Sequence, residues 1–311
     1  MMKILITALL LIIAPQQEEQ KQIEQVQSQP FTIIYNGKSI QKVNRSDVKL
    51  PHLEEKWLDM DKFNRITEEL AEKVYKEPVD AGIDDLGRIK PAKPGHQLDR
   101  QQFSELFAYY YYANQLNEVE APLRVVHPRV DEELLASIRE KPIGKYVTYY
   151  NSNNKERSQN IVLAAQAINN HVVFPRETFS FNGVVGKRTE EKGYQPAPVI
   201  VKGELAEDIG GGICQVSSTL YNAVDQAGVK IVERYSHSRS VPYVPPGRDA
   251  TVSWYGPDFS FENAYNQPIL IRAKAVKGTM QINIYSADSI QYQKRQVPNV
   301  NENTPKEVPA D

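Results

Sequence analysis

The sequence predicts an α+β fold in two domains. Two strand-like pairs surround the turn dipeptides Asn36-Gly37 and Lys277-Gly278, so strands follow one another directly instead of alternating strictly with helices. Helix-like segments with apolar residues at helical spacing stand between these groups of strands. A chain of 311 residues is long enough for two domains with hydrophobic cores.

Apolar spacing and turn residues predict the elements in chain order. Helices are expected at 59–75, 99–112, 131–140, 158–169 and from 214 to about 227. Strands are expected at 31–35, 81–84, 87–89, 172–174, 199–201, 229–232, 269–275 and 280–285. Lys141-Pro142-Ile143-Gly144 is expected to mark a boundary, which gives domains at 30–142 and 146–287 and a disordered tail at 288–311.

The N-terminal residues predict export. Lys3 precedes the apolar run Ile4–Ala14, which fits the core of a secretory signal and is shorter than the about twenty residues of a membrane-spanning helix. Pro15 follows directly, so no A-x-A cleavage site is evident. Residues 1–14 are therefore expected to be a signal peptide or a short membrane anchor, with a buried strand as the alternative, and 15–29 a polar linker outside the membrane.

The amino-acid composition limits the kinds of partner and cofactor that are expected. The 37 Lys and Arg against 39 Asp and Glu give a net charge of −2, which provides no reason to expect nucleic acid or an anionic membrane surface as a partner. One cysteine excludes an intramolecular disulfide. The five histidines are scattered and no H-x-x-x-H occurs, so the expectation is no metal and no cofactor.

The only cysteine stands in the most distinctive stretch of the chain. Cys214 follows Gly210, Gly211 and Gly212 and precedes a predicted helix. Free N–H groups and the dipole at a helix start lower a thiol pKa, and the thiolate is the nucleophile. The glycine amides and Gln215 are candidates for holding an oxyanion. The alternative is that Cys214 is a small buried apolar residue.

This stretch resembles the core motif of the VanW family. Residues 210–223 read G-G-G-I-C-Q-V-S-S-T-L-Y-N-A, without a mismatch to that motif. Other matching segments are Phe179–Asn182, Val185-Gly186, Gly193-Tyr194, Ala197–Ile200 and Tyr243–Val252. The resemblance runs from about Tyr146 to Tyr285, and the pattern at 81–99 is similar to the peptidoglycan-binding-like domain often found before VanW domains.

A nucleophilic cysteine needs a base, and His237 is the candidate. It lies 23 residues after Cys214, separated by a helix, a short strand and a turn, and the VanW pattern includes it in an E-R-x-x-H-S segment. The alternative is a surface loop residue. The group that orients the base stays open among Asp208, Glu233, Asp249 and a backbone carbonyl.

The candidates for substrate binding are Arg239, Arg248, Tyr243 and Asn182. The two arginines are suited to two-point contact with a substrate carboxylate, with a solvated surface position as the alternative for each. Tyr243 and Asn182 lie in segments that match the family. The Ser217-Ser218-Thr219 hydroxyls are expected to cap the first helical turn, since no G-x-S-x-G motif supports a serine nucleophile.

The resemblance implies an extracytoplasmic protein that acts on peptidoglycan at the cell wall. The family takes its name from a glycopeptide-resistance cluster, and VanW domains have been linked to L,D-transpeptidase activity. Cys214 would then attack the L,D bond before the terminal D-Ala of a tetrapeptide stem, and a neighbouring stem amine would accept the acyl group in a 3-3 cross-link. The S-H-G-C-x-R signature of other L,D-transpeptidases is absent. The alternative is a non-catalytic wall protein that binds glycan and stem peptides.

Overall fold

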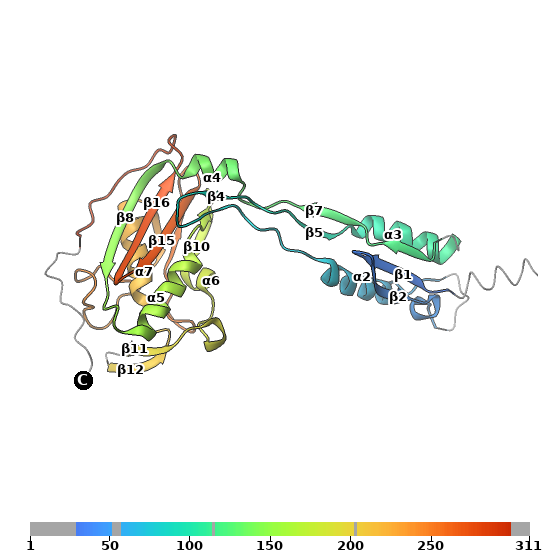
Figure 1. Cartoon of the computed structure of the whole chain (residues 1–311), viewed down its shortest axis with the longest axis horizontal. Coiled ribbons are helices and arrows are strands. Elements are labelled where there is room, and N and C mark those ends of the chain that lie inside the picture. Colours follow the sequence, from blue (N-terminus) through green and yellow to red (C-terminus); the bar gives the residue numbers. More distant parts are fainter. Residues whose placement is uncertain (1–28, 52–56, 114–115, 202–203, 300–311) are drawn as a thin grey trace, which may run out of the picture. The chain divides into compact units, whose positions relative to one another are not determined.

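The computed structural model describes residues 29–51, 57–113, 116–201 and 204–299 (Figure 1). The predicted signal segment, most of the linker and residues 300–311 of the tail lie outside the described residues. The chain divides into two compact units, one formed by the residues up to Asp80 with Ala92–Arg129, the other by Ala81–Pro91 with the chain from Val130 onward. Helices and strands are mixed in both units, which confirms the α+β class.

The N-terminal unit is built on a three-stranded sheet. Its order is β2 (Lys38–Val43), β1 (Phe31–Tyr35) and β6 (Glu118–Glu120). Asn36 and Gly37 both have positive φ, which confirms the predicted hairpin turn. The unit also contains the 3₁₀ turn η1 (Arg45–Val48), helices α2 (Met60–Val74) and α3 (Arg100–Ala108), the π turn η2 (Tyr109–Ala113) and a two-stranded antiparallel sheet of β5 (Gly95–Leu98) and β7 (Leu123–Val126).

The helices of this unit close an aromatic core. The Asp59 carboxylate caps α2 by accepting hydrogen bonds from the N–H groups of Asp61 and Lys62, as the predicted helix start requires. Of the tyrosine run, Tyr110 and Tyr111 are buried and belong to the core. The hydroxyl of Tyr110 donates to the carbonyl of Val43, so this ring is part of the fold, while Tyr109 and Tyr112 are exposed.

The C-terminal unit is built on a four-stranded antiparallel sheet. Its order is β8 (Lys141–Tyr149), β16 (Thr279–Ser286), β15 (Ile269–Val276) and β9 (Val172–Val173). Helices α5 (Lys155–Ile168) and α7 (Ile213–Gln226) pack against this sheet and against each other.

Smaller elements surround this sheet and its helices. A second sheet has the order β10 (Thr178–Ser180), β14 (Ser260–Glu262) and β13 (Lys230–Glu233). The other elements are the hairpins β3 (Gly82–Ile83) with β4 (Ile89–Lys90) and β11 (Pro196–Val201) with β12 (Glu204–Ile209), the helices α4 (Glu132–Ile138) and α6 (Phe181–Val185), and the 3₁₀ turn η3 (Glu190–Lys192).

Residues Lys141–Gly144, expected to mark a domain boundary, form the first part of β8. Proline is tolerated there because β8 is an edge strand, and the register with β16 shifts at this point. Gly144 is required by a close approach, since a Cβ at this position would lie 2.2 Å from the carbonyl oxygen of Ala223 on α7. Pro142 and Gly144 are of residue types that usually mark a boundary, but here they belong to an edge strand on which α7 packs.

Most other predicted elements of this unit are confirmed. The β15–β16 hairpin turns at Lys277 and Gly278, both with positive φ. Helix α5 begins at Lys155, three residues before the predicted start, because the Asn154 side chain caps it by accepting from the N–H of Arg157.

We predict that Gly144→Ala destabilises the C-terminal unit. The added methyl group would force α7 away from β8, and overpacking of this kind costs about 1–3 kcal/mol in the free energy of unfolding. Urea unfolding followed by circular dichroism measures it. Gly256→Ala is the matched control, because its Cβ would meet only Ser253, at 3.4 Å. Equal stability of both variants would contradict the close approach.

Candidate active site

The glycine loop brings Cys214 to the start of α7. Gly210 and Gly212 have φ values of 95° and 101°, a region that L side chains rarely adopt. A Cβ at Gly211 would lie 2.6 Å from the carbonyl oxygen of Ala197 in β11. The three glycines therefore let the loop turn sharply against neighbouring backbone. Cys214, the second residue of the helix, is half-buried.

His237 lies beside the thiol, and Asp249 holds its imidazole ring through Nδ1. The Asp249 Oδ2 atom lies 2.7 Å from His237 Nδ1 and also accepts a hydrogen bond from the His237 backbone N–H at 2.6 Å. The imidazole lies close enough to the Cys214 thiol for each group to shift the pKa of the other, while the sulfur itself lies 3.5 Å from the carbonyl oxygen of Val252. Because Asp249 occupies Nδ1, Nε2 is the nitrogen left for the thiol. The side chains of His237 and Asp249 are only 6% and 8% exposed.

Two serines of α7 hold the segment that carries Asp249. The hydroxyls of Ser217 and Ser218 donate to the carbonyl of Ala250, and the Ala250 N–H donates to Ser218 Oγ at 2.8 Å. Both hydroxyls also lie within hydrogen-bond distance of the Cys214 carbonyl oxygen, Ser217 at 3.1 Å and Ser218 at 2.6 Å, as predicted for local caps. They therefore do more than cap the helix, since they join its first turns to residues 249–252. The next residue, Thr251, places its Oγ1 3.7 Å from the Cys214 sulfur.

The electrostatics favour a thiolate paired with an imidazolium. Desolvation raises the pKa of Cys214, but the hydrogen bond and charge of His237 outweigh it and lower the pKa below the ordinary thiol value. Desolvation lowers the pKa of His237, but the bonds to Asp249 and Cys214 raise it to about 9. Burial raises the pKa of Asp249, yet its two hydrogen bonds from His237 hold that pKa below the usual value. The proton shared by the thiol and the imidazole therefore lies on His237.

Among the predicted oxyanion groups, several donors are already engaged. The Gly210 N–H donates to the Gln195 carbonyl at 3.1 Å, and the Gln215 side chain is buried in the fold. Its Nε2 donates to the Tyr149 carbonyl and its Oε1 accepts from Arg157, so it joins α7 to β8 and α5. Within the described residues no hydrogen bond is assigned to the N–H of Cys214 itself.

The two predicted arginines lie elsewhere. Arg248 is an ion-pair partner of Asp225 at 2.7 Å and donates to Asn222. Asn222 follows Cys214 by about 12 Å along the helix, at 1.5 Å per residue. The Arg248 guanidinium is therefore engaged in joining its loop to the far part of α7. Arg239 is exposed on the loop after His237.

Tyr243 and Asn182 are both buried near the site. Burial and the charge of Cys214 raise the pKa of Tyr243 well above its ordinary value, while interaction with Ser218 lowers it in part. Asn182 accepts a 2.7 Å hydrogen bond from Nη2 of Arg188, a residue that sequence reasoning missed. Arg188 follows the matching segment Val185-Gly186 closely, but no spacing rule distinguishes it from a surface arginine.

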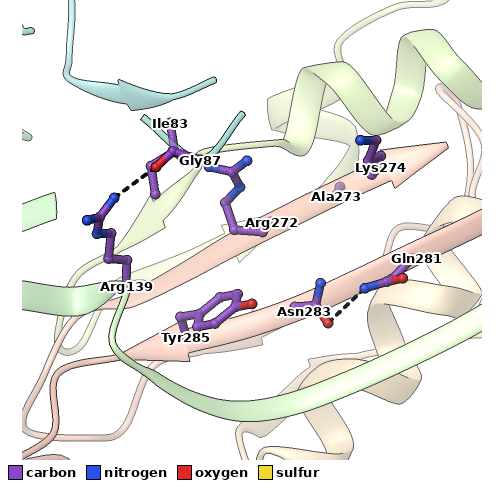
Figure 2. A pocket seen from close by; sticks show the side chains of 9 residues that line it. All are labelled: Ile83, Gly87, Arg139, Arg272, Ala273, Lys274, Gln281, Asn283 and Tyr285. Atoms are coloured by element: carbon purple, nitrogen blue, oxygen red, sulfur yellow. Dashed lines mark hydrogen bonds between the residues drawn. The ribbon is translucent and has the colours of Figure 1, made fainter. Parts of the chain in front are cut away.

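A separate hollow of about 300 Å³ lies over β15 and β16 of this unit (Figure 2). Figure 2 shows Arg139 donating to the Gly87 carbonyl at its rim. The hollow contains neither the cysteine nor its partners. Its lining residues are Ile83, Gly87, Arg139, Arg272, Ala273, Lys274, Gln281, Asn283 and Tyr285.

Two kinds of feature are absent from the described ranges. Residues 29–51, 57–113, 116–201 and 204–299 contain no group of three or more His, Cys, Asp or Glu side chains arranged to hold a metal ion. In the same ranges, no helix combines the length and the apolar character needed to cross a membrane.

Comparisons with known proteins agree with the motif. The family model described as "VanW like protein" matches residues 156–285, which include the whole triad. The chain is 52% identical over 311 residues to "Uncharacterized protein YoaR" of Bacillus subtilis (strain 168), with 100% of both chains covered. It is 32% identical over 78 residues to "Vancomycin B-type resistance protein VanW" of Enterococcus faecalis (strain ATCC 700802 / V583), over 25% of this chain and 28% of that protein. No solved structure matches.

The family match, the full-length relative and the intact glycine–cysteine motif therefore agree, and the chain belongs to the VanW family.

Proposed function

We propose that this protein is a cysteine acyltransferase that acts on peptidoglycan stem peptides as an L,D-transpeptidase. The observation that carries the proposal is the Cys214–His237–Asp249 triad at the start of a helix, with a half-buried thiol and buried His237 and Asp249 side chains. A thiol with a lowered pKa, a base in contact with it and a carboxylate behind the base are the parts of an activated nucleophile.

The triad supports both halves of an acyl transfer. The Cys214 thiolate attacks the carbonyl carbon of the scissile amide, and the imidazolium of His237 then gives its proton to the departing amine. A thioester on Cys214 and a free amino acid result. In the second half the neutral imidazole takes a proton from the attacking amine of another stem, the new amide forms, and the thiolate leaves. Asp249 stabilises the charged imidazole in the free enzyme, before the first half and again after the second.

The oxyanion of the tetrahedral intermediate is assigned to the backbone at the helix start. The N–H of Cys214 belongs to the first turn of α7, whose amides lack intrahelical acceptors and lie at the positive end of the dipole. The positions of Gly211 and Gly212 keep side chains away from this place. Gly210 and Gln215 are not assigned this role, since their donors are engaged in the fold.

Family membership supports peptidoglycan as the substrate class. The name of one relative states resistance to vancomycin, which is a glycopeptide antibiotic. The family takes its name from a glycopeptide-resistance cluster. An extracytoplasmic location, a short N-terminal signal or anchor, and binding of peptidoglycan by the N-terminal unit belong to the same proposal.

The direct test is to trap the acyl-enzyme. We predict that mass spectrometry of the whole protein, incubated with muropeptides that carry tetrapeptide stems, detects an adduct on Cys214 with the mass of the donor less D-Ala. Cys214→Ala should form neither adduct nor cross-link while retaining its fold, because the change leaves almost no cavity. Unchanged cross-linking by Cys214→Ala would refute the proposal. Stem binding without any adduct would favour a non-catalytic wall protein.

We predict a thiol reactivity profile displaced to low pH. The thiolate is present above its pKa, so with a lowered pKa the alkylation of Cys214 by iodoacetamide should continue below about pH 8.5 and decline only as the pH falls through that lower value. His237→Ala removes the stabilising bond and charge but keeps the desolvation, so the profile should move upward and the rate at about pH 7 should fall more than about 10-fold. Coincident profiles would contradict the ion pair.

We predict that Asp249→Asn lowers the rate of acyl transfer by about 10²–10⁴-fold. The amide keeps the size of the side chain but no longer stabilises the imidazolium, so the pKa of His237 should fall from about 9. An NMR titration of the imidazole measures that change. Glu233→Gln is the matched control, because Glu233 is another acidic candidate for the orienting group and lies at the end of β13, before His237 in the sequence. Comparable losses in both variants would argue against a specific role for Asp249.

A further inference from the structure

Arg188 lies across the glycine loop next to the nucleophile. A Cβ at Gly210 would come within 3.3 Å of Arg188 Cγ, so the aliphatic part of the arginine covers this glycine. On the other side, the guanidinium carbon lies 6.0 Å from the centroid of the Phe181 ring at the start of α6. The side chain is thus confined between the loop that precedes Cys214 and the first residue of α6.

The direction of the guanidinium is fixed by Asn182. Asn182 Oδ1 accepts from Arg188 Nη2 at 2.7 Å, while its Nδ2 donates to the carbonyls of Ser253 and Pro257 at 3.0 and 3.1 Å. These two carbonyls settle the orientation of the amide, because only its nitrogen can donate to them. Asn182 therefore presents its oxygen to the arginine and holds one edge of the guanidinium.

Asp258, the carboxylate that acts on the charge of Arg188, does not form an ion pair with it. Asp258 accepts hydrogen bonds from the Ser180 hydroxyl and from the N–H groups of Asn182 and Phe259. Within the described residues no carboxylate comes within 4.0 Å of the Arg188 nitrogens, and buried Nη1 has no hydrogen-bond partner. A buried donor without a partner is destabilising, so its presence needs a reason.

The charge on this arginine acts on the reactive centre, because its side chain packs on the glycine loop that leads to Cys214. Desolvation lowers the pKa of Arg188, and the first charged group that raises it is the thiolate of Cys214. Arg188 is therefore a desolvated cation near the nucleophile. Asn182 holds its Nη2, and its Nη1 has no hydrogen-bond partner. A guanidinium of this kind is suited to a carboxylate, which it binds with charge-assisted hydrogen bonds.

We infer that Arg188 binds the free C-terminal carboxylate of the donor peptide. The inference rests on the proposed acyl transfer at Cys214. In a donor that ends one residue after the scissile bond, the terminal carboxylate carbon is only three covalent bonds from the carbonyl carbon that the thiolate attacks. A cation next to the thiol can therefore hold that carboxylate during the attack. The site then selects donors that end at this residue over amidated or extended peptides.

Alkylation by two reagents tests the anion site without transpeptidation. Iodoacetate carries a carboxylate and iodoacetamide a neutral amide, and both react with the same thiolate, so the ratio of their rates cancels any change in thiol pKa. We predict that Arg188→Gln lowers the ratio of iodoacetate to iodoacetamide rates about 10-fold or more, while Arg188→Lys keeps part of the preference. Lys187→Gln, which removes the neighbouring exposed charge, should leave the ratio unchanged. An unchanged ratio in Arg188→Gln would overturn the inference.

Two donors test the role in the reaction. With the full chain, Arg188→Gln should lower kcat/KM for a tetrapeptide stem with a free carboxylate about 10-fold or more, and hardly change it for the same stem with a terminal carboxamide. Equal losses for both donors would overturn the inference and indicate that Arg188 stabilises either the oxyanion or the fold. If the melting temperature of Arg188→Gln equals that of the wild-type protein, the fold is not affected and the oxyanion explanation holds. If no donor reacts even with the wild-type protein, the proposed function fails, and the alkylation ratio still decides whether Arg188 forms an anion site.

Discussion

The site depends on the hydrogen bonds that join the first turns of α7 to the backbone of Ala250. Ser217 and Ser218 supply them from a helix face that is fully buried. Asp249 precedes Ala250, so the same bonds fix the carboxylate that orients His237. Cys214 lies one turn earlier on the same helix. Nucleophile, base and orienting carboxylate are therefore held by one short contact between two segments, and a small displacement of that contact would separate all three.

The surroundings of α7 leave the helix little freedom to move. Gly144 allows β8 to approach the backbone of Ala223 closely, and Gln215 joins the helix to both β8 and Arg157 of α5. Thr219 adds a 2.8 Å hydrogen bond to Thr148 of β8. Such buried polar contacts contribute modest net stability, but each fixes a direction. The helix start can thus hold a charged pair in a half-buried place without rearranging, which is the condition for preorganised catalysis.

Much of this arrangement could be predicted from the sequence, for identifiable reasons. Hairpins with Asn-Gly or Lys-Gly turns and helices with capping residues such as Asp59 follow local rules, and the structure confirms them. The pairing of Cys214 with His237 followed from chemistry and from the family pattern. Asp249 could only be one candidate among several, because a hydrogen bond across 12 residues of irregular loop depends on tertiary folding. The edge strand β8 was concealed because Pro142 and Gly144 have tertiary reasons to be there.

The arginines show why residue type alone does not identify a binding group. Arg248 lies in a matching segment and has the right chemistry, yet Asp225, Asn222 and Tyr221 occupy its donors. Its charge is neutralised inside the fold and cannot attract a substrate. Arg188 has the same side chain, but its neighbouring carboxylate is engaged by backbone N–H groups and a hydroxyl. What separates a structural arginine from a binding one is the state of its partners, which is a property of three-dimensional packing. An unneutralised cation beside a thiolate is stable only where the fold holds it, and Asn182 does so here.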